Sequence, residues 1–338
     1  MHCLQSPGAR ACRAMTSLAS TVPSTTTTVA RWRASFVDAD PALAGLFERL
    51  HRAHDPPLHV NRQPDVKTDE LPAILNGAPI AIIDHTSLPT AVAARCPGLK
   101  HVVFLGTGAR SYMDPEALAA LGIAVHTIKG YGDTAVAECA FALMWAAARG
   151  LARMDRELRA GRWPRTDGMQ LRGKTLGLIG FGGIAQELAR LALGAGMRVV
   201  AWNRSPRDHA GVEFVGVDAL LAASHVVSLH LLLTDETRGF LSRARIATMR
   251  DGAVLVNTAR GALLDEPALV DALACGKLAH AGLDVFTVEP LPAQHPFTTL
   301  PNVTLSAHSA FRTPEAGINL VEAALVHCRR IAADSGGA

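Results

Sequence analysis

Three ionisable residues, Arg260, Glu289 and His308, follow the apolar runs "AVLVNTA", "GLDVFTV" and "VTLSA". An arginine can bind a carboxylate through two parallel hydrogen bonds and polarise the carbonyl beside it. A protonated histidine can deliver a proton to that carbonyl oxygen, and a nearby glutamate would favour the imidazolium and fix its orientation. Taken singly, the three have simpler interpretations: a surface charge, a turn before Pro290 and a structural histidine. Taken together, they predict a site that binds and protonates a carbonyl next to a carboxylate.

A glycine-rich turn lies upstream, between the apolar run "TLGLIG" and a helical pattern. Its residues, "GFGGIA", fit G-x-G-x-x-G/A, in which Gly180 permits the tight turn and Gly182 lets the backbone approach a pyrophosphate. Ala185 is small enough for close helix–strand packing, and the N–H groups of Gly183 and Ile184 would face the phosphates. The pattern predicts dinucleotide binding. A glycine-rich packing turn is the alternative.

The next strand ends in "AWNRSPR", with Asn203 where such a fold usually carries an acidic residue. A carboxylate there accepts hydrogen bonds from the ribose and repels a 2′-phosphate. Arg204 instead offers a planar charged donor to phosphate oxygens, and Ser205 adds a hydroxyl. We therefore expect NADP to be favoured over NAD. The alternative is a solvated Arg204, with Asn203 bonding the ribose of NAD.

Two series of alternating strands and helices must position these residues. From residue 41 to 128, helical spacing alternates with short apolar runs such as "AIIDHT" and "HVVFLG". From residue 175, Val/Leu/Ile runs without polar alternation indicate a parallel sheet that is covered on both faces. Ligands of such sheets lie beyond the carboxyl ends of the strands, so the three ionisable residues should open onto one edge. We expect an α/β protein with two doubly wound parallel-sheet domains.

Composition excludes several other classes. The net charge of +3 over 338 residues, without a Lys/Arg-rich stretch, argues against nucleic acid. The longest apolar stretch is interrupted by Glu138 and ends at Arg149, which favours a buried helix over a membrane span. The six cysteines are scattered, without C-x-x-C pairs or metal-ligand spacing. We therefore expect no metal and a reducing, cytoplasmic compartment.

The first 37 residues contain no acid and many Ser and Thr. Alone they fit a transit peptide. We favour a disordered tail over residues 1–37, or a start codon assigned upstream of Met15.

At this point a family resemblance is evident. The motifs "LRGKTLGLIGFGGIA", "HLLLTDETRGFL", "DGAVLVNTARGALLDEPALVDAL", "AGLDVFTVEPLP" and "AHSAFRT" resemble the D-isomer-specific 2-hydroxyacid dehydrogenase family, over about residues 70–325. The resemblance implies a flavodoxin-like substrate domain (38–128 plus 314–338), a Rossmann dinucleotide-binding domain (129–313) and a cleft between them. It also implies a homodimer.

The resemblance further implies that Arg260, Glu289 and His308 are the catalytic residues. It assigns further contacts to the nicotinamide (Thr258, Asp284), the dinucleotide (Leu232, Thr237) and, through backbone amides, the substrate carboxylate (Thr107, Gly108). The expected reaction is hydride transfer between NAD(P)H and C2 of a small 2-keto acid, of the glyoxylate or hydroxypyruvate type. A cofactor-sensing binding protein, like the family's corepressors, is the alternative.

Two departures from the family concern the substrate pocket. Phe311 occupies a position that is often Gly, which would reshape the pocket. Arg110 stands where Asp is common, and with Arg312 it could meet a second anionic group of the substrate. A pairing of Arg110 with Asp114 is the alternative.

Overall fold

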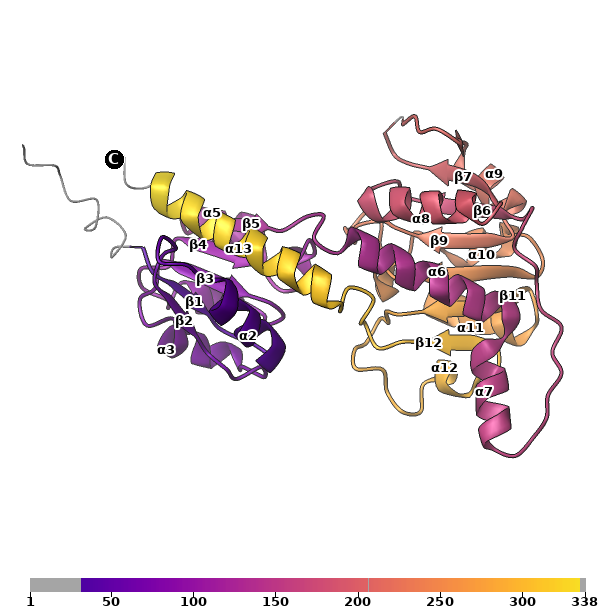
Figure 1. Cartoon of the computed structure of the whole chain (residues 1–338), viewed down its shortest axis with the longest axis horizontal. Coiled ribbons are helices and arrows are strands. Elements are labelled where there is room, and N and C mark those ends of the chain that lie inside the picture. Colours follow the sequence, from indigo (N-terminus) through magenta and orange to yellow (C-terminus); the bar gives the residue numbers. More distant parts are fainter. Residues whose placement is uncertain (1–31, 206, 335–338) are drawn as a thin grey trace, which may run out of the picture.

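The structure, a computed structural model, describes residues 32–205 and 207–334 and contains two parallel β-sheets (Figure 1). The expectation of a tail over residues 1–37 extends too far, because Ala34–Phe36 form β1, in the interior of the first sheet. All three residues of β1 are buried. The sequence pattern missed this strand because three residues are too few to show a period. Residues 1–31 lie outside the described residues.

The first sheet has five strands in the order β2-β1-β3-β4-β5, all paired in parallel. The strands are β1 (Ala34–Phe36), β2 (Leu58–Val60), β3 (Ile80–Ile83), β4 (His101–Phe104) and β5 (Ala124–Thr127). The helices among them are α2 (Pro41–Leu50), α3 (Leu71–Leu75), α4 (Thr90–Ala93) and α5 (Pro115–Ala120), with 3-10 turns η1 (Thr68–Glu70) and η2 (Ala109–Ser111).

The last described helix, α13 (Pro314–Asp334), returns to this first sheet and packs against α2 and β4 (Figure 1). Leu320, Val321 and Ala324 are buried there. Arg329 donates to the buried Asp55 (2.5 Å), which fixes the helix to the loop after α2. Residues far apart in the sequence therefore share one hydrophobic core.

The second sheet has seven parallel strands in the order β12-β11-β10-β9-β6-β7-β8. The strands are β6 (Thr175–Ile179), β7 (Arg198–Trp202), β8 (Val212–Phe214), β9 (Val226–Leu229), β10 (Ala253–Asn257), β11 (Leu278–Leu283) and β12 (Val303–Leu305). The strand order reverses between β6 and β9, where doubly wound sheets bind their ligands. The expected fold class, with a Rossmann-type sheet, is confirmed.

Helices cover both faces of the second sheet. They are α6 (Asp133–Arg149), α7 (Leu151–Arg159), α8 (Gly183–Gly194), α9 (Val217–Ala223), α10 (Arg243–Thr248), α11 (Glu266–Ala274) and α12 (Pro296–Thr299), with the 3-10 turn η3 (Gly261–Leu263). α6 packs on α8, β10 and β11, and most of its alanines are buried. Among the described residues, no single helix is long and apolar enough to cross a membrane; the pair α6–α7, bent by 65°, meets that test on length and composition only.

Candidate active site

The glycine turn connects β6 to α8 at the centre of the second sheet. Gly180 has φ +90°, and a side chain there would lie 2.5 Å from the carbonyl oxygen of His230. Gly182 caps α8, and nothing lies within 4 Å of the place where its Cβ would be. At Gly183 a Cβ would overlap the Asp133 carboxylate. The turn therefore requires small residues and leaves the backbone open at the amino end of α8, where anions bind.

Asn203 follows β7 and joins two loops. Its side-chain oxygen accepts a hydrogen bond from the Phe181 N–H (3.2 Å), and its amide donates to the Ser205 carbonyl (2.9 Å). Arg204 and Ser205 are exposed. Asn203 therefore bonds the glycine turn, whereas the neighbouring side chains of Arg204 and Ser205 are exposed.

The loop after β9 presents an apolar side chain to solvent. Leu232 is 64% exposed. The Thr237 hydroxyl donates to the Leu232 carbonyl (2.6 Å) and accepts from the Thr234 N–H (2.7 Å). Thr237 thus shapes the loop that carries Leu232. If this loop contacts a dinucleotide, Thr237 contributes by holding the loop in place.

Arg260 follows β10, and buried Asn257 fixes its backbone. The Asn257 amide donates to the Arg260 carbonyl (2.9 Å), and its oxygen accepts from the Ala259 N–H (3.0 Å). The guanidinium donates to the Ala259 carbonyl (2.7 Å) and lies against Gly108, where a side chain would overlap it. The structure therefore brings the predicted arginine of one sheet onto the predicted substrate loop of the other.

Asp284 follows β11 and is completely buried. Its carboxylate accepts hydrogen bonds from the Ser306 hydroxyl (2.5 Å) and from the N–H groups of Ser309 (3.0 Å) and Ala310 (3.1 Å). Its backbone carbonyl accepts from the His308 N–H (2.7 Å). Asp284 therefore organises the loop that presents His308, whereas its expected contact with the nicotinamide stays a prediction.

His308 and Glu289 form a hydrogen-bonded pair, with 2.6 Å between Nδ1 and the carboxylate. The other Glu289 oxygen accepts from the Phe286 N–H (2.8 Å). Because a carboxylate only accepts, Nδ1 carries the proton and Nε2 faces away from Glu289. Burial would raise the pKa of Glu289, but the bonds from His308 and Phe286 and the charge of Arg260 hold it below its usual value. Glu289 is therefore ionised at neutral pH.

The surroundings of the pair are also defined. The His308 ring meets the Phe311 ring edge-on (6.3 Å between centroids), and Phe311 in turn contacts Tyr131 (6.4 Å). Burial raises the pKa of Tyr131 to about 12, with a contribution from the charge of Asp84. Tyr131 thus stays a neutral hydroxyl beside the site.

Comparison with known proteins identifies the chain. The family model "D-isomer specific 2-hydroxyacid dehydrogenase, NAD binding domain" matches residues 141–310. A hydroxypyruvate reductase of Thermotoga maritima is 39% identical, over 76% of this chain and 87% of that protein. The chain belongs to the D-isomer specific 2-hydroxyacid dehydrogenase family.

Solved structures agree with this dehydrogenase assignment. A glyoxylate reductase from Paecilomyes thermophila superposes with a TM-score of 0.80 at 30% identity, covering 89% of this chain and 95% of that one. An acyclic imino acid reductase solved with NADPH and D-Arg gives a TM-score of 0.76 at 29% identity, covering 86% and 94%. The chain is thus an NAD(P)-dependent oxidoreductase of the 2-hydroxyacid dehydrogenase type.

The residues of this dehydrogenase fit a nicotinamide dinucleotide. The open backbone at Gly182, the exposed Leu232 and the turn at Gly180 together leave a cradle at the switch point of the sheet. The buried hydroxyl of Thr258 has no hydrogen-bond partner among the described residues. This hydroxyl lies two residues before Arg260 in the chain and could form a hydrogen bond with a polar group of a bound ligand.

The dehydrogenase also has polar residues at the site edge that the sequence analysis did not select. Asp84 and His85 follow β3, and β3 pairs with β4, so they lie beside the substrate loop that follows β4. Buried Asp38 accepts from three N–H groups of this segment, those of Asp84, His85 and Thr86. The bond to Asp84 raises the pKa of His85 to about 9, so the ring is charged at neutral pH. The rule that selected His308, a polar residue just after an apolar run, also applies to "AIIDHT".

The two arginines considered for a second anionic group have partners in this structure. Arg110 pairs with Glu116 rather than with Asp114, because Asp114 caps α5 through the N–H groups of Glu116 and Ala117. Arg312 pairs with Asp40 (2.8 Å). Among the described residues, no group of three or more His, Cys, Asp or Glu is arranged to hold a metal.

Proposed function

We propose that the chain reduces short 2-keto acids of the glyoxylate and hydroxypyruvate type to D-2-hydroxy acids, with NADPH as the favoured donor. The observation that carries the proposal is the contact between Arg260 and Gly108, together with the Glu289–His308 pair. Relatives whose names state hydroxypyruvate and glyoxylate reduction support the substrate class.

Arg260 would bind the substrate carboxylate together with the backbone amides of Thr107 and Gly108. Thr107 is exposed and Gly108 half-buried, so these amides lie at an accessible edge. A guanidinium and two amides supply directed, charge-matched donors, which also orient the neighbouring carbonyl. The bond from Arg260 to the Ala259 carbonyl limits the freedom of this side chain before the substrate binds.

His308 would donate the proton to the carbonyl oxygen from Nε2. Glu289 holds the ring through Nδ1 and, being ionised, stabilises the imidazolium. When bound, the nicotinamide supplies the hydride that adds to C2. In the oxidative direction, Nε2 would accept the hydroxyl proton.

The cofactor would be held by the glycine turn (Gly180, Gly182, Gly183, Ile184), the loop after β7 (Asn203, Arg204, Ser205) and the loops after β9 to β11 (Leu232, Thr237, Thr258, Asp284). The preference for NADP is supported by Arg204, which is exposed beside an Asn203 that is already hydrogen-bonded. A structural neighbour solved with NADPH is consistent with this choice.

The test is reduction of glyoxylate and hydroxypyruvate by His308→Ala beside the parent protein. Loss of a general acid lowers kcat about 10²–10⁴-fold. NADPH binding, followed by quenching of its fluorescence, should persist and shows that the variant is folded. His54→Ala is the matched control, since the His54 side chain is 68% exposed. If neither acid is reduced while NADPH binds, a wider panel of 2-keto acids comes next; inactivity with the whole panel would favour a cofactor-sensing binding protein.

A cytoplasmic homodimer completes the proposal. The four cysteines in the described part of the chain are free, which suits a reducing compartment. The partner would be a second copy of this chain, contacted through exposed apolar residues of α7 and of the segment after it: Leu151, Leu158 and Trp163.

A further inference from the structure

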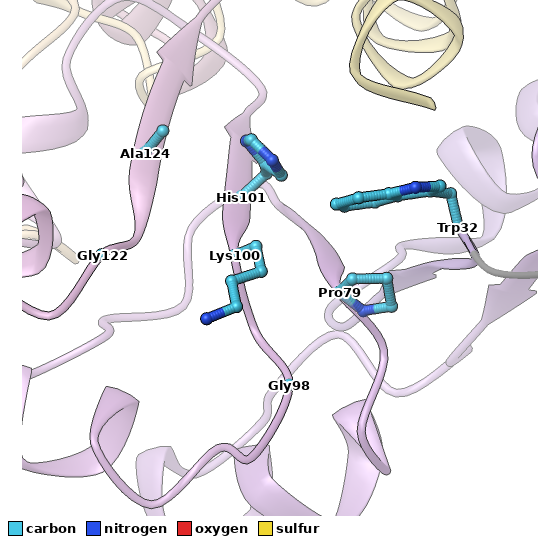
Figure 2. A pocket seen from close by; sticks show the side chains of 7 residues that line it. All are labelled: Trp32, Pro79, Gly98, Lys100, His101, Gly122 and Ala124. Carbon is cyan, nitrogen blue, oxygen red and sulfur yellow. The ribbon is translucent and has the colours of Figure 1, made fainter. Parts of the chain in front are cut away.

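A cavity of about 440 Å³ opens at the amino ends of the first sheet, on the side opposite the loops that carry Gly108 (Figure 2). Its wall is formed by Trp32, Pro79, Lys100 and His101 and by the small residues Gly98, Gly122 and Ala124. Figure 2 shows the His101 ring beside the Trp32 indole, and their centroids are 5.6 Å apart. Small residues on one wall and an aromatic ring on the other leave room for a ligand.

A second cavity, of about 230 Å³, shares His101 with the first and continues along α13. It is lined by His126, His327 and Arg330, together with Ile331 and Asp334. His101 and His126 are in contact, with 3.2 Å between Nδ1 and Nε2. The rings of His126 and His327 are 5.7 Å apart. We call this combined surface, made of Trp32, Lys100, His101, His126, His327 and Arg330, the histidine groove.

The charges around the groove are predominantly basic. Lys100 directly precedes β4, His101 is its first residue, His126 comes from β5, and α13 contributes His327, Arg330 and Asp334. Asp334 is the single acid among these lining residues; it lies 3.6 Å from Arg330, and both side chains are more than 70% exposed. Asp334 offsets part of the charge of Arg330, and Lys100 and Arg330 together still leave the lining with a net positive charge.

The histidines respond to this environment. Burial lowers the pKa of His101, His126 and His327, and the charges of Lys100 and Arg330 lower it further. At neutral pH the three rings are therefore uncharged, although they lie among cations. A bound anion would offset the repulsion between a protonated ring and the nearby cations, and this would allow the rings to take up protons.

We propose that the histidine groove binds a small oxyanion, of sulfate, phosphate or carboxylate chemistry, at a site separate from the active site. Lys100 and Arg330 supply fixed positive charge, and the histidines supply donors that gain protons as the anion binds. A metal is the poorer ligand, because no three metal-ligating residues in the described part of the chain are suitably arranged.

The groove and the active site lie at opposite ends of the same strand. His101 is the first residue of β4 and Phe104 the last, a rise of about 10 Å at about 3.3 Å per residue. The loop with Gly108 begins directly after β4. Occupation of the groove should therefore stabilise α13 on the first sheet without competing for the substrate.

The test uses the full chain and inorganic sulfate, whose charge is constant near neutral pH. The imidazole C–H signals of His101, His126 and His327 in NMR spectra report binding in the groove and separate it from anions at the amino end of α8. We expect saturable shifts of these signals. Uptake of one proton per anion predicts that the dissociation constant rises with pH, by up to about tenfold per pH unit, between the lowered pKa of the free ring and the higher pKa of the anion-bound ring.

Two variants and a matched control make the result specific. Lys100→Gln and Arg330→Gln should each weaken sulfate binding about fivefold, because each removes one positive charge from the cavity that it lines and with it about 1 kcal/mol of attraction for a divalent anion. Arg190→Gln should leave sulfate binding unchanged, because Arg190 does not line either cavity. It is a matched control, since it is an exposed helical arginine that pairs with an acid one turn away, as Arg330 does. Keto acid reduction without sulfate should be the same in all four proteins. The absence of saturable shifts, a dissociation constant independent of pH, or equal weakening by the control variant would overturn the proposal.

Discussion

The backbone conformation of His308 is the most constrained feature of the site. Its φ of +47° lies in the left-handed region, which costs a non-glycine residue about 1–3 kcal/mol. The surrounding loop holds it there through the four hydrogen bonds that Asp284 accepts. Three of these bonds go to the carboxylate and one goes to the backbone carbonyl, so the buried carboxylate has hydrogen-bond donors from the loop that carries His308.

The cofactor preference depends on one exposed side chain. We expect Arg204→Ala to lower kcat/KM with NADPH about 10-fold or more, since a charge-assisted bond to a phosphate contributes about 1.5–3 kcal/mol, and to leave NADH little changed. Initial rates with the two cofactors, measured side by side, decide the matter. Arg207→Ala is the matched control, since Arg207 is exposed in the same loop. An NADH preference untouched by Arg204→Ala would make this arginine a solvated surface residue.

Residue types at the ends of apolar runs were sufficient to select Arg260, Glu289 and His308, because the order of the chain determines which residues come directly after a strand. Residue types alone could not identify residues whose role depends on contacts in the folded protein. Asn257 lies within β10 and positions Arg260 through two backbone bonds, which no sequence period reveals. The pairing of Arg110 with Glu116 likewise depends on how η2 meets α5.

Among the elements, the 3-10 turn η3 lies directly between the segments that carry Arg260 and Glu289. A side chain at Gly261 would overlap the backbone of Phe286 and Thr287, close to Glu289. Gly261→Ala should therefore displace Arg260 or Glu289, and a misplacement of about 1 Å can cost about 100-fold in kcat/KM. Steady-state rates and NADPH binding measure the effect. Gly45→Ala, a position with nothing within 4 Å, is the control and should retain activity; unaltered kinetics in Gly261→Ala would show that this contact is dispensable.

The pairing of β11 with β12 contains a buried histidine. His280 is 5% exposed, contacts the Thr304 hydroxyl (2.9 Å), and has its pKa lowered to about 4 by burial. Because the pKa of His280 is lower in the folded than in the unfolded protein, its contribution to the free energy of unfolding is fully present above the ordinary pKa of 6.5. This contribution is lost as the pH falls towards about 4. Between about pH 7.5 and about pH 5, His280 should lower the free energy of unfolding by about 2 kcal/mol.

Urea unfolding at the two pH values tests this expectation. His280→Gln can keep a bond to Thr304 but cannot be charged, so it should lose about 2 kcal/mol less than the parent protein on acidification. His54→Gln, at an exposed position, should behave like the parent protein. An equal loss in the His280 variant would assign the acid sensitivity to other groups.

The elements differ in how well the sequence predicts them. Largely apolar runs predicted β6, β9, β10 and β11, because strands that are buried on both faces consist mostly of apolar residues. The sequence patterns did not predict the three-residue β1 or the helix α7. α7 has no buried residue, and five of its nine residues are charged, so its short apolar face does not stand out in the sequence.

At the scale of the whole molecule, the two sheets meet where their strands end. Arg260 against Gly108 and Arg312 paired with Asp40 join them. The expectation of a cleft between the two domains came from the family resemblance, whereas the rule for doubly wound sheets placed Arg260, Glu289 and His308 at one edge of one sheet. The contacts themselves join residues that are 152 positions apart (Gly108 and Arg260) and 272 positions apart (Asp40 and Arg312), and local patterns carry no information about them.

The proposed homodimer predicts a specific surface. Leu151, Met154 and Leu158 share one face of α7, and Leu151 and Leu158 are about half exposed; the nearby Trp163 is 78% exposed. Exposed apolar patches of this kind are typical of interfaces. Leu158→Glu should shift sedimentation from dimer to monomer, because it would bury a charge in the interface. Val326→Glu, which changes a 52% exposed residue of α13, should stay dimeric. A monomeric parent protein would contradict the dimer, and a dimeric Leu158→Glu would place its interface on another face.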